Sequence, residues 1–255
     1  MQQYRNTDYI RLSAALHARE ARLLTHAMLA RMLDAPTPEE SWKTLSDCGY
    51  DALERCTMET VERALAQQRA ALYRELRTMA PDTRAVEMFQ LRYDYHNAKL
   101  ALKGKCSGAE VSALAADCGR FDAGALLRGD ASALPLPVRR AMVQAEREAE
   151  GGDLRAAELT LDCACFKELA ELAAGTGSEF AVGYAALATD AANLRTLVRI
   201  RRMGGGDELL RAALLHGGRI PVQALLSTRG GGLEELTRTG PLRAAGELAV
   251  PLLDG

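Results

Sequence analysis

The sequence predicts an all-α fold. Three observations lead to this prediction. Ala, Leu, Arg and Glu dominate the 255 residues, and these residue types lose little on entering a helix. Aromatic residues make up only 5% of the chain. Helix start and stop signals recur along the whole sequence, whereas the alternation typical of strands hardly appears.

Start and stop signals place the helices of the N-terminal part. Thr37 suits an N-cap, Pro38 the first helical position, and Glu40 completes a capping box. Gly49 is expected to end that short helix, and Pro81 the long amphipathic helix that follows it. The predicted helices cover about residues 4–33, 37–49, 57–80 and 83–104.

The remaining chain is expected to continue in the same way. Ser107 and Glu110 form a second S-x-x-E capping box, which predicts a short helix closed by Gly119. The segment LPLP and the pairs and runs of glycine separate the later elements. Further helices are predicted at about 121–127, 137–150, 153–174 and 178–203, with short ones around residues 209 and 225.

The helix pattern D-x-x-N-x-[KR] occurs twice, 96 positions apart. Downstream of each copy, GRFDAGALL from Gly119 matches GRIPVQALL from Gly218. Two similar units of about a hundred residues follow from this recurrence. The residues concerned are Asp94, Asn97, Lys99, Lys103 and Lys105 in the first copy and Asp190, Asn193, Arg195, Arg199 and Arg201 in the second.

Two interpretations of the recurrent polar residues stay open. The Asp and Asn lie three residues apart, and therefore on one helix face, while the basic residues gather on another. The Asp and Asn can be structural, accepting from and donating to backbone groups at a neighbouring helix end. Alternatively, they belong to a site that faces a partner protein.

At these residues the chain resembles a known family. LRYDYHNAKLALKGK and ALATDAANLRTLVRIRRMG are similar to the motif helices of the C-type subunit family of the V/A-type rotary ATPases, whose eukaryotic members are the d-type subunits of the V-ATPase. The segments EARLL, LTLDCACFKEL and HGGRIPVQALL agree as well. The resemblance extends from about residue 9 to residue 226.

The resemblance implies three similar helical units around a pseudo-threefold axis, which form a funnel. Such a protein is a non-catalytic socket in the central stalk. It joins the rotor shaft subunits, of D and F type, to the membrane ring of proteolipid subunits in ATP-linked proton or sodium transport. The expected units are 1–127, 128–226 and 227–255, the last being the start of a truncated third unit.

The resemblance also suggests roles for the recurrent residues. It implies that Asp94, Asn97, Asp190 and Asn193 are framework residues. The basic residues of both copies are candidate contacts to partner subunits because they recur at matching positions. An incomplete third unit would leave apolar side chains exposed. The candidate contacts are Lys99, Lys103, Arg195, Arg199 and Arg201, and the leucines expected to be exposed are Leu233, Leu236, Leu242 and Leu248.

Other functions lack support in the sequence. The phosphate-binding pattern G-x-x-x-x-G-K-[ST] is absent, no catalytic triad can be assembled, and no cofactor is implied. Cys163 and Cys165 lack a second ligand pair for zinc, and Cys165 falls on an apolar stripe that predicts a core position. A net charge of -2 argues against nucleic-acid binding.

The expected location and one rival function complete the sequence-based expectations. The charged N-terminal segment lacks the apolar core of a signal peptide, and no apolar run is long enough to span a membrane. The protein is therefore expected in the cytoplasm, peripheral at the membrane within a complex. The rival function is a cytosolic helical-repeat adaptor that binds protein partners.

Overall fold

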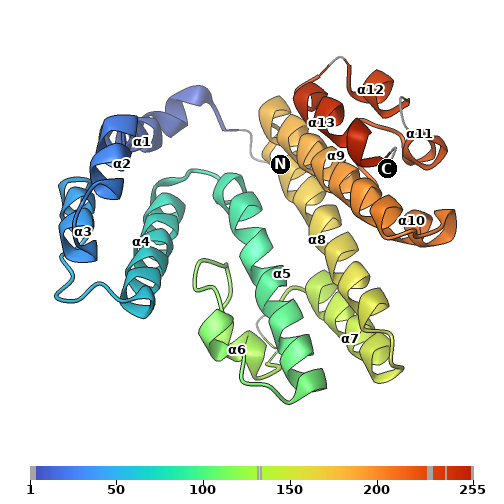
Figure 1. Ribbon diagram of the computed structural model, residues 1–255. Coiled ribbons are helices and arrows are strands. Elements are labelled where there is room, and N and C mark those ends of the chain that lie inside the picture. The colour runs from blue at the N-terminus through green and yellow to red at the C-terminus, as the bar shows by residue number, and fades with distance from the viewer. Residues whose placement is uncertain (1–3, 131, 133, 229–231, 239, 254–255) are drawn as a thin grey trace.

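The computed structural model describes residues 4–130, 132, 134–228, 232–238 and 240–253, and every regular element in these residues is a helix (Figure 1). The predicted all-α class is confirmed. Short 3-10 helices cover Asn6–Tyr9 and Ser112–Leu114. The α-helices are α1 Ile10–Glu20, α2 His26–Leu33, α3 Pro38–Asp47, α4 Met58–Met79, α5 Arg84–Ser107, α6 Ala123–Leu127, α7 Leu136–Glu150, α8 Leu154–Thr176, α9 Glu179–Arg202, α10 Asp207–Ala213, α11 Val222–Ser227, α12 Gly232–Thr237 and α13 Arg243–Leu253.

The helices form two apolar cores that share α9. In Figure 1, α1–α3 lie on one side of the molecule and α10–α13 on the other, with the long helices α5, α8 and α9 between them. Leu91 of α5 and Leu161 of α8 belong to the first core, which also takes side chains from α6, α7 and the start of α9. Leu197 of α9 and Leu225 of α11 belong to the second core. The shared helix α9 therefore joins the two packed regions.

The predicted start of the helix at Thr37 and Pro38 is confirmed. The Thr37 hydroxyl accepts the backbone N–H of Glu40 at 3.2 Å, and Pro38 occupies the first helical turn. These contacts satisfy an N–H group that has no partner within the helix. The end of α5 is marked by Gly108, whose φ of 67° lies in the left-handed region that favours glycine.

The prediction of one helix over residues 4–33 was wrong. The Thr25 hydroxyl accepts the backbone N–H of Met28 at 3.2 Å and starts α2 as a separate helix. The chain turns between Ala21 and Thr25 before that start. A threonine can cap a helix in the middle of a helix-favouring sequence, because its side chain competes for the backbone groups.

The prediction of a short α-helix after Ser107 was also wrong. The Ser107 hydroxyl accepts the N–H of Ala109 at 3.2 Å, and the Glu110 carboxylate accepts that of Ser112 at 2.8 Å. Each of these hydrogen bonds joins residues two positions apart. Ser107 and Glu110 therefore do not form the predicted capping box, which joins residues three positions apart. A 3-10 helix lies in this loop instead, and α5 extends through Ser107.

The C-terminal helices pack better than expected. Leu233 was expected to be exposed, yet it is buried in the second core because α12 packs on α13 and α13 on α9. Leu236 and Leu242 are partly buried. Leu248 alone of the four leucines meets the expectation, with 75% of its surface exposed.

Candidate functional site: two loop clamps and a basic groove

The Asp94 and Asn97 side chains of α5 bind the loop that leads into α6. Asp94 Oδ1 accepts the backbone N–H groups of Arg120 at 2.8 Å and of Phe121 at 3.3 Å. Asn97 is fully buried, and it donates to the carbonyl of Ala116 and accepts from its N–H, each at 2.9 Å. We call this arrangement, Asp94 and Asn97 with residues 116–121, the first loop clamp.

The second motif helix makes the same contacts with its own loop. The Asp190 carboxylate accepts the backbone N–H groups of Arg219 and Ile220, each at 3.0 Å. Asn193 donates to the carbonyl of Leu215 at 2.8 Å and accepts from its N–H at 2.7 Å. Asp190 and Asn193 with residues 215–220 form the second loop clamp.

The contacts explain how two poor helix formers are tolerated inside long helices. Asp and Asn side chains usually compete with their own backbone for hydrogen bonds. Here both pairs point away from their helix and satisfy buried backbone groups of a loop, which are costly to leave without partners. The clamps therefore fix loops that have little regular structure of their own.

A glycine lies against the aspartate in each clamp. A Cβ atom on Gly119 would lie 2.3 Å from Asp94 Oδ1, and one on Gly218 would lie 2.0 Å from Asp190 Oδ1. Real Cβ atoms do not approach an oxygen that closely. Each loop therefore requires glycine at this position for its close approach to the helix.

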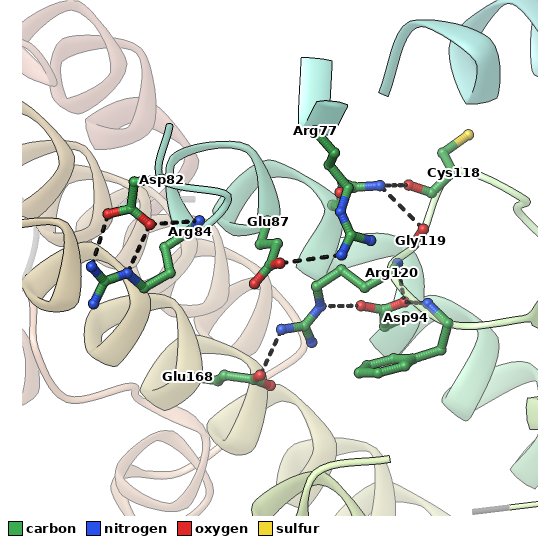
Figure 2. A network of polar contacts seen from close by, with 11 residues as sticks. Arg77, Asp82, Arg84, Glu87, Asp94, Cys118, Gly119, Arg120 and Glu168 are labelled. Atoms are coloured by element: carbon green, nitrogen blue, oxygen red, sulfur yellow. Dashed lines mark hydrogen bonds and ion pairs between the residues drawn. The ribbon is translucent and has the colours of Figure 1, made fainter. Parts of the chain in front are cut away.

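Arg120 extends the first clamp into a buried ionic network, shown in Figure 2. Its guanidinium donates to Asp94 Oδ2 at 2.6 Å and to Glu168 Oε1 of α8 at 2.7 Å. The Tyr95 hydroxyl donates to the other Glu168 oxygen at 3.0 Å. Burial alone would lower the pKa of the Arg120 guanidinium, but hydrogen bonds to the two carboxylates outweigh it and raise the pKa. Arg120 thus stays charged.

Sequence reasoning missed this network and one further anchor. The Gln90 amide donates to the carbonyls of Cys118 and Gly119, at 2.9 and 3.1 Å. The signal for Arg120 was present, because each downstream segment begins with Gly-Arg. Its partner Glu168 lies 48 residues away in the chain, and nothing in the sequence pairs the two.

The basic residues of the first motif are paired within the chain. Lys99 contacts Asp162 at 2.5 Å and Lys103 contacts Glu158 at 2.6 Å, both on α8. Lys105, the third of them, lies 3.5 Å from Glu146 and 3.4 Å from Glu150 of α7. These lysines therefore hold the α7–α8 hairpin against α5.

The basic residues of the second motif are only partly paired. Arg201 contacts Asp207 at 2.6 Å. Arg195 and Arg199 are exposed, and neither forms an ion pair or a side-chain hydrogen bond with any described residue. The recurrent cations thus fall into a paired set on α5 and a largely unpaired set on α9.

The cysteines offer little for metal chemistry. Cys165 packs against the first core, which confirms its predicted position. Burial raises the pKa of the Cys165 thiol to about 12, so the thiolate that would bind a metal is disfavoured. Within the described ranges, no three His, Cys, Asp or Glu side chains gather to hold a metal ion.

A family model described as ATP synthase (C/AC39) subunit matches residues 12–239. The chain belongs to this family. No curated protein sequence matches the chain. The matched range contains both loop clamps and the basic residues of α5 and α9, and it confirms the predicted membership.

Membership in the C/AC39 family makes the protein a subunit of a V/A-type ATPase, a class of ion-transporting complex. The loop clamps are therefore features of a component of that complex. Among the described residues of this C/AC39 protein, no helix combines the length and apolar character needed to cross a bilayer.

Proposed function

We propose that the chain is the connector of the central stalk, coupling the rotor shaft subunits of D and F type to the membrane ring of proteolipid subunits. Family membership supports a place in the complex. The recurrence of one loop clamp on α5 and α9 is the observation that best supports a mechanical role. Close-packed helices with fixed loops deform little, which suits a part that transmits torque.

The proposal includes a modular organisation. Residues 1–127 and 128–226 would be two copies of one unit, and residues 227–255 would belong to a third unit. The matching hydrogen bonds of Asn97 and Asn193 support the first part. The packing of α13 on α9 supports the second.

A stiff junction between the first two units also favours torque transmission. Arg120 belongs to the first unit, and its ion pair partner Glu168 belongs to the second. The ion pair is nearly buried on both sides, so solvent and salt screen it little. Rotation applied to one unit would thus pass to the other with little local bending.

Binding to the shaft tests this function first. Purified shaft subunits passed over the immobilised chain should be retained, while a resin carrying an unrelated helical protein of similar size and charge should not retain them. Addition of the chain to a complex depleted of this component should restore ATP-driven ion transport. If the shaft subunits are not retained and transport is not restored, the connector role is rejected and the adaptor is the better interpretation.

In the complex, the chain would lie peripherally at the cytoplasmic face of the membrane.

A further inference from the structure

Two exposed arginines of α9 correspond in the motif to two lysines of α5 that bind helix α8. Arg195 and Arg199 follow Lys99 and Lys103 by 96 positions. The two lysines bind carboxylates that lie four residues apart on α8. The corresponding arginines have no such partner among the described residues.

Helix α13 lies beside these arginines but does not supply carboxylates to them. Between Arg243 and Leu253 its only acidic residue is Glu247, which pairs with Arg243 at 2.8 Å. The α13 side chains that line the groove beside these arginines are alanines and leucines. Helix α13 therefore supplies apolar side chains beside Arg195 and Arg199 but no carboxylate that pairs with them.

A groove of about 660 Å³ runs between α9 and α13. Its apolar lining includes Val198, Met203, Leu248 and Leu252, and three arginines also line it, Arg195, Arg199 and Arg202. Met203 is 70% exposed and Leu248 75% exposed. Exposed apolar side chains of this size, rimmed by charge of one sign, are typical of a surface that binds a protein segment.

Arg219 shows the same difference between the two motifs. It takes the place of Arg120 in the second loop clamp, where the first clamp has an ion pair to α8. Arg219 is exposed, and its guanidinium forms no ion pair with a described carboxylate. Helix α8 thus forms three ion pairs with recurrent cations, and none of the three has a counterpart among the described residues around α9.

We propose that the α9–α13 groove binds an amphipathic helix of a partner protein, with two carboxylates four residues apart beside an apolar stripe. The pairing on α5 also sets a direction. Glu158 meets Lys103 and Asp162 meets Lys99, so α8 runs antiparallel to α5. The partner helix would run antiparallel to α9, with its first carboxylate at Arg199 and its second at Arg195. This inference is independent of the proposed function.

A peptide copy of α8 is a suitable probe. A fluorescein-labelled peptide of residues 154–172, with Cys163 and Cys165 replaced by Ser, is titrated with the full chain, and its anisotropy is followed. The R195E/R199E variant should bind it at least about tenfold more weakly than the unchanged chain. The matched control R139E/R140E changes two exposed arginines of α7 and should stay within about twofold.

Changes in the peptide complete the test. Replacing the peptide's carboxylates, as in E158Q/D162N, should weaken binding as much as R195E/R199E does. A peptide with E158K/D162K should bind the R195E/R199E variant better than it binds the unchanged chain. Equal binding of all peptides, or equal binding by both charge-reversed variants, would overturn the proposal.

Two other occupants would give different results. Sedimentation of the chain with vesicles of phosphatidylcholine and phosphatidylglycerol, lost in R195E/R199E, would assign the groove to a lipid surface and overturn the proposal. A dimer seen by analytical ultracentrifugation and lost in the same variant would assign the groove to a second copy and overturn it as well. Both arginines are exposed, so circular dichroism of R195E/R199E should match that of the unchanged chain.

Discussion

Asn97 and Asn193, 96 positions apart, each hold one loop residue by both of its backbone groups, Ala116 and Leu215 respectively. Both asparagines are fully buried. An amide side chain can donate and accept at once, which neither a carboxylate nor a hydrocarbon of similar size can match. The relationship explains why asparagine stands at both positions.

Replacing either asparagine should destabilise the fold. We expect N97A and N193A each to lower the free energy of unfolding by about 2–4 kcal/mol, because a buried N–H and carbonyl lose their partners. Urea denaturation followed by circular dichroism measures the change. A loss under about 0.5 kcal/mol for either variant would show that the clamp contributes little.

The glycines of the clamps should tolerate no side chain. G119A and G218A place a methyl group against an aspartate oxygen, and each should cost at least about 2 kcal/mol of unfolding free energy. Gly240 provides the control, because a Cβ there meets nothing within 4 Å. The same denaturation series should show G240A close to the unchanged protein, and equal behaviour of all three variants would speak against the clamp geometry.

The two clamp arginines should differ sharply. R120A leaves two nearly buried carboxylates without their partner and should cost about 3–5 kcal/mol. R219A removes an exposed side chain and should stay within about 0.5 kcal/mol. Thermal unfolding of the two variants compares them directly. Similar melting temperatures would contradict the buried network at Arg120.

Thiol labelling should follow burial and pKa. Cys106 is exposed, whereas Cys165 is partly buried with its pKa raised to about 12. A pKa about three units above the ordinary value lowers the thiolate fraction at neutral pH by roughly a thousandfold. Mass spectrometry after timed exposure of the folded protein to N-ethylmaleimide should find Cys106 modified first. Labelling should speed up as pH rises, and equal rates at both residues would contradict this arrangement.

Much of the fold could be predicted because its signals are local. Caps such as Thr37 and breaks such as Pro81 act within a few residues, so the long helices were placed to within a few positions. The break at Thr25 was missed because the same side chain can cap a helix or lie inside one. The turns at Ser107 and Glu110 were missed because the capping pattern carries no information on competing local contacts.

The candidate site was predicted only in part for a similar reason. The recurrence of Asp94 and Asp190 can be read directly from the amino-acid sequence, so the sequence predicted both clamp positions. The partners of Lys99 and Arg120 lie on α8, and their pairing depends on how distant helices pack. The exposed state of Arg195 likewise depends on the side chains that α13 turns toward it.

The central claim is that the chain connects two partners at once, and the mass of the assembly tests it most directly. Native mass spectrometry of the chain mixed with purified shaft subunits and detergent-solubilised proteolipid ring should detect a complex that contains all three. Complexes with only one partner at a time, in which shaft and ring displace each other from the chain, would contradict the account.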